Sequence, residues 1–110
     1  MLHPCFRIPR QSGWGWDQRR RLQYRRIDRY LTPLAVPMKR YGPGSRGATR
    51  SHHRPLEAYV DGLVRQGLRI DALREIPTFE RSGAGARAGA ENRAAEEIPL
   101  FLAVRAVRRG

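Results

Sequence analysis

Three histidines and a single cysteine are the residues of this chain best suited to chemistry. His3 and Cys5 stand near its beginning, and His52 and His53 are adjacent near its middle. All four side chains are of types that bind zinc, but their spacing matches no established zinc pattern, and prolines lie beside both pairs. No Ser-His-Asp or Cys-His arrangement stands out either. We therefore predict no metal site and assign no catalytic residue from spacing alone.

The chain is strongly basic. Its 110 residues carry a formal net charge of +12, from 21 arginines and one lysine against 10 acidic residues. Such an excess is typical of proteins that bind nucleic acid or an anionic surface. Arginine almost without lysine is also what a GC-rich coding sequence produces. A general compositional bias is therefore the favoured explanation, and a nucleic-acid partner is disfavoured.

The sequence gives three indications of the compartment. Cys5 is the only cysteine, which excludes an internal disulfide framework and suits a reducing environment. The first residues lack the charged and apolar regions of a secretory signal. No window approaches the ~18 consecutive apolar residues of a membrane span. We expect a soluble, cytoplasmic protein without a membrane partner.

Two segments of the first half are expected to be loops. Residues 1–16 contain Pro4, Pro9, Gly13 and Gly15 between isolated large apolar residues, so a regular element is not expected there. Residues 42–51 offer nothing apolar to bury and predict a mobile loop.

Between these loops, the spacing predicts a helix over residues 17–31. The segment is free of Gly and Pro, and Asp17 is placed to cap its first amides. Four apolar or aromatic residues recur at helical spacing: Tyr24, Ile27, Tyr30 and Leu31. The other face of this helix would hold Arg19, Arg20, Arg21, Arg25, Arg26 and Arg29. A basic nucleic-acid-binding module that uses this arginine face is the alternative function.

The second half predicts a regular order of elements. A helix is expected over 55–66, with an apolar stripe and with Gly67 as its left-handed stop. A strand over 68–76 follows, which needs a bulge or burial on both faces because Leu73 is out of step with Ile70. The stripe consists of Leu56, Tyr59, Val60, Leu63 and Val64.

The remainder of the chain predicts a linker, a short helix and a final strand. Residues 81–90 are small, polar or basic and indicate a linker, after which residues 91–97 suit one or two helical turns. The last strand is expected over 99–108, with apolar residues on both faces and hence with neighbours on both sides.

Four short motifs, taken in order, are similar to those of a known enzyme family. They are His3-Pro4-Cys5-Phe6, the stretch from Arg26 to Leu31, His53-Arg54-Pro55-Leu56, and Ile98-Pro99-Leu100-Phe101-Leu102. Together they resemble the C-terminal part of a class I S-adenosylmethionine (SAM)-dependent methyltransferase of the small-molecule type, similar to methyltransferase types 11 and 12. The resemblance covers almost the whole chain.

The resemblance implies an α/β fold, the C-terminal portion of a Rossmann-like sheet. Its elements would be the end of a strand at Met1 and Leu2, a substrate-covering segment of helix and loop, then a helix, a strand and a strand. Residues 1–52 would form the substrate-covering segment and residues 53–110 the helix-strand-linker-strand unit. A complete sheet of this kind needs well over ~130 residues, so the fold is expected to be incomplete as an isolated domain.

The resemblance also implies a transfer of a methyl group to a small-molecule acceptor. The residues it suggests for acceptor binding are His3, Phe6, Trp14, Tyr30 and His53. His3 would stand at the carboxyl end of a strand, where open α/β sheets bind ligands, or it would hydrogen-bond its own turn. His53 has a capping or packing role as its alternative, and the aromatic residues have a place in the core as theirs.

SAM is the cofactor of that family, but no binding site for it is expected on this chain. The glycine-rich loop after a first strand and the acidic residues that bind the ribose and adenine are missing. Gly83-Ala84-Gly85 follows a polar stretch rather than a buried strand, so it is a poor substitute. The chain alone is therefore expected to be inactive, with the missing N-terminal half as a candidate partner.

Overall fold

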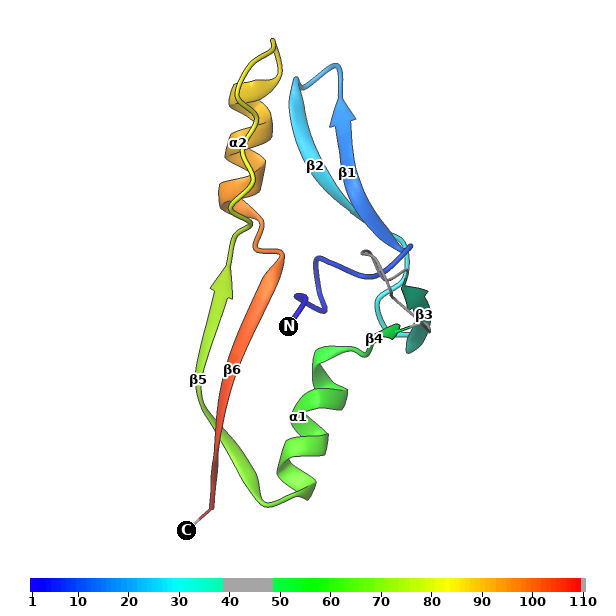
Figure 1. Cartoon of the computed structure of the whole chain (residues 1–110), viewed down its shortest axis with the longest axis vertical. Coiled ribbons are helices and arrows are strands. Elements are labelled where there is room, and N and C mark those ends of the chain that lie inside the picture. Colours follow the sequence, from blue (N-terminus) through cyan, green and yellow to red (C-terminus); the bar gives the residue numbers. More distant parts are fainter. Residues whose placement is uncertain (39–48, 110) are drawn as a thin grey trace, which may run out of the picture.

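The computed structural model describes residues 1–38 and 49–109 (Figure 1). The elements follow one another as β1 (Ser12–Asp17), β2 (Leu22–Ile27), β3 (Leu34–Met38), β4 (Thr49–His53), α1 (Leu56–Arg65), β5 (Leu68–Ile76), α2 (Ala88–Glu97) and β6 (Phe101–Arg108).

The predicted α/β fold is wrong: the structure is a small mixed domain of antiparallel strand pairs and two helices. Its sheets are β1–β2, β3–β4 and β5–β6, and each pair is antiparallel. A parallel pair needs a crossover that carries the chain back along the sheet. Here Ile76 lies opposite Phe101, so the chain that leaves β5 through α2 returns at the same end of the sheet. The described residues therefore do not form a portion of a Rossmann-like parallel sheet.

The predicted helix over 17–31 is also wrong, because residues 17–27 form the end of β1, a turn and β2 of a hairpin. The backbone amide of Arg20 donates to the Asp17 carboxylate at 2.9 Å. That contact spans three residues, the same separation as a helix cap, and it serves equally well in a turn. Arg21 then has a φ of 51°, a left-handed conformation that reverses the chain instead of continuing a helix.

Part of the predicted loop over 1–16 is strand β1. Its Gly-Trp-Gly-Trp alternation has the period of two that strands require, so the two tryptophans share one face and the two glycines share the other. Tyr24 lies directly opposite Gly15, and the tyrosine ring covers the space that a glycine leaves free. The alternation of tryptophan and glycine therefore favours a strand more strongly than the two glycines disfavour a regular element.

The predicted loop over 42–51 is wrong at its end. Thr49, Arg50 and Ser51 belong to β4, which pairs with β3, and residues 42–48 lie outside the described part of the chain.

The positions predicted for the helix and the two strands of the C-terminal half are confirmed. The prediction that the last strand has neighbours on both sides is wrong, because among the described residues β6 pairs only with β5 apart from one bridge to Leu2. Helix α1 and strands β5 and β6 form where the periodicity places them, and Gly67 ends the helix with a φ of 75°. The register of β5 shifts between Ile70 and Ala72, which is the bulge that the pattern required. Helix α2 begins at Ala88, so it is longer than the predicted turns and takes in the end of the predicted linker.

The elements form an elongated molecule rather than a compact one. Helix α2 lies alongside β2 at one end, and α1 lies alongside β5 at the other, with Met1 between them (Figure 1). The radius of gyration is 16.9 Å, against about 13 Å for a compact chain of this length. The buried apolar residues are few: Ile8, Val36, Ala94, Ala95, Leu100 and Leu102.

Candidate functional site

The N-terminal turn positions His3 inside the molecule. Leu2 forms a bridge with Phe101, and the backbone amide of His3 donates to the Leu100 carbonyl at 2.9 Å. The carbonyl of His3 in turn accepts hydrogen bonds from the amides of Phe6 and Arg7, which closes the turn. Only 2% of the His3 surface is exposed.

Both ring nitrogens of His3 have partners, which determines its tautomer. The Cys5 amide donates to Nδ1 at 3.1 Å, so Nδ1 carries no proton. The proton of the neutral ring is therefore on Nε2, which donates to Oε2 of Glu75 at 2.7 Å. Glu75 comes from β5 and is half-exposed. These bonds correspond to the alternative in which the histidine hydrogen-bonds its own turn, and they add a carboxylate that the sequence did not indicate.

Tyr30 joins the N-terminal turn to the start of α1. Its hydroxyl oxygen accepts the amide of Leu56 at 2.9 Å and lies 3.8 Å from Sγ of Cys5. Its carbonyl accepts a hydrogen bond from Nε2 of the buried His53 at 2.6 Å. Burial raises the pKa of Tyr30 above its usual range. Three segments that are distant in the sequence therefore meet at this one residue.

Arg25 connects Trp14 to the same region. Its Nε donates to the Phe6 carbonyl at 2.7 Å, and its guanidinium lies over the Trp14 ring at 4.9 Å from the ring centroid. Burial lowers the pKa of Arg25, and the nearby charges of Arg7 and Arg26 act in the same direction. This arginine was predicted on an exposed face, but it lies across the hairpin and is directed inward.

The structure thus links the five predicted acceptor residues by a chain of contacts. Phe6 lies against the His3 ring, with centroids 4.8 Å apart, and the Tyr30 and His53 rings are 6.0 Å apart. Trp14 is connected to them through Arg25. Two small cavities adjoin this set, one of about 250 Å³ bordered by Trp14 and one of about 210 Å³ bordered by His53.

A larger cavity lies elsewhere, between α1 and the β5–β6 pair. Its volume is about 530 Å³, which would suit a small molecule. Its lining is almost wholly aliphatic, however, with Arg54 and Tyr59 as the polar exceptions. We interpret it as an incompletely covered core, because a ligand site needs several convergent polar groups.

The glycines that could hold SAM do not fit the cofactor. Gly83, Gly85 and Gly89 precede or begin α2 without a buried strand before them, and a Cβ atom added at any of them would meet nothing within 4 Å. A cofactor cradle would instead show close neighbours. The described residues also contain no group of three or more His, Cys, Asp or Glu side chains able to hold a metal ion.

The arginines of residues 17–31 do not form the predicted face. Arg25 is directed inward, and Arg26 forms an ion pair with Asp28 on the hairpin surface. The argument for a nucleic-acid-binding helix therefore no longer holds, because the helix does not exist.

Comparisons of the chain with family models, with curated proteins and with solved structures found no match. In the part of the chain that the structure describes, neither helix has the length and apolar character needed to cross a membrane.

Proposed function

We propose that this chain forms the acceptor-binding part of a SAM-dependent methyltransferase that acts on a small molecule. The observation that supports it is the meeting at Tyr30 of the segments that carry the resemblance. The turn after His3 contributes Cys5, the end of β4 contributes His53, and the start of α1 contributes Leu56. These segments are far apart in the sequence, yet they meet at one residue, as parts of a single site would.

Within this proposal, His3, Tyr30 and His53 are positioning residues. Methyl transfer from a sulfonium depends mainly on the orientation of the acceptor and on the exclusion of water. His3, held by Glu75 and by the Cys5 amide, fixes the turn that carries Phe6. Trp14 and Phe6 are the side chains that offer aromatic surface to an acceptor.

The cofactor must come from a part of the enzyme outside the described residues. Because the glycines before α2 do not fit SAM, we assign no step of the reaction to this chain's own residues beyond binding and orienting the acceptor. The isolated chain should therefore neither bind SAM nor release S-adenosylhomocysteine.

The test is to tag this chain in its native cells and isolate it without denaturation. We expect a preparation in which a further polypeptide accompanies the chain or extends it, and which binds SAM and releases S-adenosylhomocysteine when small molecules from the same cells are added. Intact-mass spectrometry shows whether the further part is covalently joined. Micromolar SAM binding by the purified 110 residues, or no SAM binding by the native preparation, would contradict the proposal.

A matched pair of tryptophan variants tests the acceptor site. Trp14→Ala in the native preparation should raise KM for the acceptor and leave SAM affinity unchanged. Trp16→Ala is the control, because Trp16 lies on the same face of β1 but stacks under Arg87 instead of Arg25. Equal effects of the two variants on KM would contradict the role of Trp14.

A further inference from the structure

The outer edge of β6 is largely unpaired within the described residues. Strand β5 pairs with β6 on one side along its whole length. On the other side, only Met1 and Leu2 approach, through the bridge of Leu2 to Phe101. The stretch from Ala103 to Arg108 has no strand neighbour on that side within the described residues.

Met1 pairs with β6 as a residue of a third strand would. Its carbonyl accepts the Leu102 amide at 2.9 Å, and its amino group donates to the Leu102 carbonyl at 3.0 Å. This mutual exchange defines a hydrogen-bonded antiparallel pair. By the alternation of the ladder, the amides and carbonyls of Val104 and Ala106 also face the open edge.

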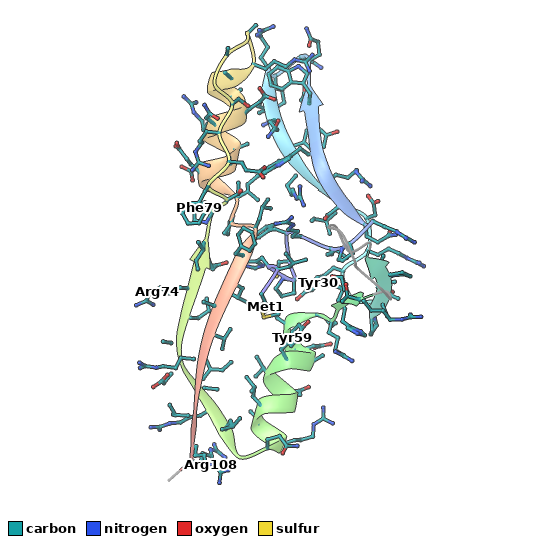
Figure 2. The ribbon with its side chains drawn as sticks, viewed as in Figure 1. Met1, Tyr30, Tyr59, Arg74, Phe79 and Arg108 are labelled. Atoms are coloured by element: carbon teal, nitrogen blue, oxygen red, sulfur yellow. The ribbon has the colours of Figure 1, made fainter. Side chains whose placement is uncertain are left out.

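The side chains along this edge leave an apolar cavity open. Leu102, Val104 and Ala106 share the face of β6 that is turned toward α1, and all three line the cavity of about 530 Å³. Figure 2 shows Met1 and Tyr59 between β6 and α1, and both residues border the same cavity. Val60 and Val64, on the predicted apolar stripe of α1, remain exposed. The outer edge of β6 and the apolar stripe of α1 are therefore both uncovered, and one segment could cover both.

We propose that an extended segment of a partner polypeptide adds to β6 as an antiparallel third strand, in line with Met1 and Leu2, and covers the cavity with every second side chain. Backbone pairing supplies affinity and the alternate side chains supply specificity in this mode of recognition. The segment would run opposite Ala103 to Arg108, with its C-terminal end beside the Met1 amino group. Its side chains opposite Val104 and Ala106 would be apolar.

Charge favours a different polypeptide over a second copy of this chain. Arg105 and Arg108 lie on β6, and Arg109 follows it. Two β6 edges paired antiparallel would bring these arginines of both copies together. A partner residue opposite Arg105 would instead be acidic, as Asp71 already is on the β5 side, 2.7 Å from the Arg105 guanidinium. The inference rests on the proposed function only in assigning the segment to the polypeptide that carries the cofactor site.

The test uses the whole 110-residue chain and the synthetic peptide Val-Thr-Val-Glu-Val-Thr, whose valines would lie opposite Val104, Ala106 and Arg108. Hydrogen exchange resolved by residue should show slower exchange of the Val104 and Ala106 amides when the peptide is added. The Ala103 and Arg105 amides are the internal control, because they face β5. The same peptide linked directly before Met1 should give the same protection at high effective concentration.

Methylation of the peptide backbone provides a matched control without any change to the protein. N-methyl groups on two valines remove donors that face β6 and should weaken binding about tenfold or more. N-methyl groups on the two threonines face away from β6 and should change affinity little. Equal effects of both methylated peptides, no protection even in the linked form, or protection through dimerisation of the chain would overturn the proposal. None of these outcomes depends on SAM, so failure here is distinct from failure of the proposed methyltransferase function.

Discussion

Glu75 accepts the hydrogen bond that holds the buried His3 ring in place, so removing its carboxylate should destabilise the fold. Glu75→Ala would leave the Nε2 proton of a buried imidazole without an acceptor. We expect the free energy of unfolding to fall by about 1 to 3 kcal/mol in denaturant titration. Glu75→Gln keeps an oxygen acceptor at the same place and should restore most of the loss. An equal loss in both variants would mean that the hydrogen bond to His3 is not the cause.

Tyr30 should make stability depend on pH in the alkaline range. Burial raises its pKa in the folded chain, while the unfolded chain titrates near ~10. The stability from this difference is therefore complete below pH ~10 and is lost as pH rises through the folded pKa. Denaturation midpoints measured from pH 8 upward should fall above pH 10, and fall less in Tyr30→Phe. An unchanged profile in Tyr30→Phe would contradict the assignment.

Individual residues show which interactions the sequence could indicate. Short motifs suggested His3, Phe6, Tyr30 and His53, and the structure connects them through contacts, while their binding of an acceptor stays a prediction. Glu75 was missed because it lies 72 residues from His3 in the chain, and no local pattern links the two. The inward direction of the Arg25 side chain was not predicted, because it follows from the position of Arg25 in strand β2 and the sequence indicated a helix there.

At the scale of elements, the β1–β2 hairpin depends on a glycine opposite an aromatic ring. A Cβ atom added at Gly15 would overlap the Tyr24 ring, whereas one at Gly13 would meet only the Arg26 side chain at 3.4 Å. Gly15→Ala should therefore cost about 1 to 3 kcal/mol, and Gly13→Ala should stay within about 0.5 kcal/mol. Thermal unfolding compares the two variants. Equal losses would show that the ring can move aside without cost.

Glycine-to-alanine substitutions inside α1 and just after its C-terminal end should change the free energy of unfolding in opposite directions. Gly67 has a φ of 75°, so Gly67→Ala places a side chain in a strained conformation and should destabilise the chain by about 1 kcal/mol. Gly62 lies inside α1 with nothing within 4 Å of an added Cβ atom. Gly62→Ala should stabilise the chain by about 0.5 to 1 kcal/mol. Chemical denaturation measures both, and changes of the same sign would contradict the helix end described here.

The elements also show why one half of the chain was predictable and the other was not. In α1, β5 and β6, the periodicity of apolar residues and Gly67 agree on the same boundaries. In residues 17–27, the side chains fit both a helix and the second half of a hairpin, and Asp17 caps either one. The periodicity of apolar residues does not determine whether two strands pair in parallel or antiparallel. The pairing direction follows from where the connection through α2 returns, and for this reason the predicted Rossmann-like sheet was wrong.

At the scale of the whole molecule, the folded chain leaves much of its surface exposed. Its accessible area is 8347 Å², whereas a compact protein of this mass exposes about 6,200 Å². Part of the exposed surface is apolar, since Val64 of α1 and Ile70 and Leu73 of β5 meet solvent. The incomplete fold was predicted as part of a Rossmann-like sheet, and that prediction is wrong because the strands form antiparallel pairs.

This exposure predicts a shallow denaturation transition. The denaturant m-value is proportional to the area exposed on unfolding, and for this chain that area is roughly a fifth smaller than for a compact chain of equal length. We therefore expect an m-value about a fifth below the value usual for 110 residues, together with a radius of gyration near 16.9 Å in small-angle scattering. Linking the strand peptide before Met1 should raise the m-value, because the added contacts are lost on unfolding. A normal m-value with a radius near 13 Å would mean that the isolated chain closes its own edge.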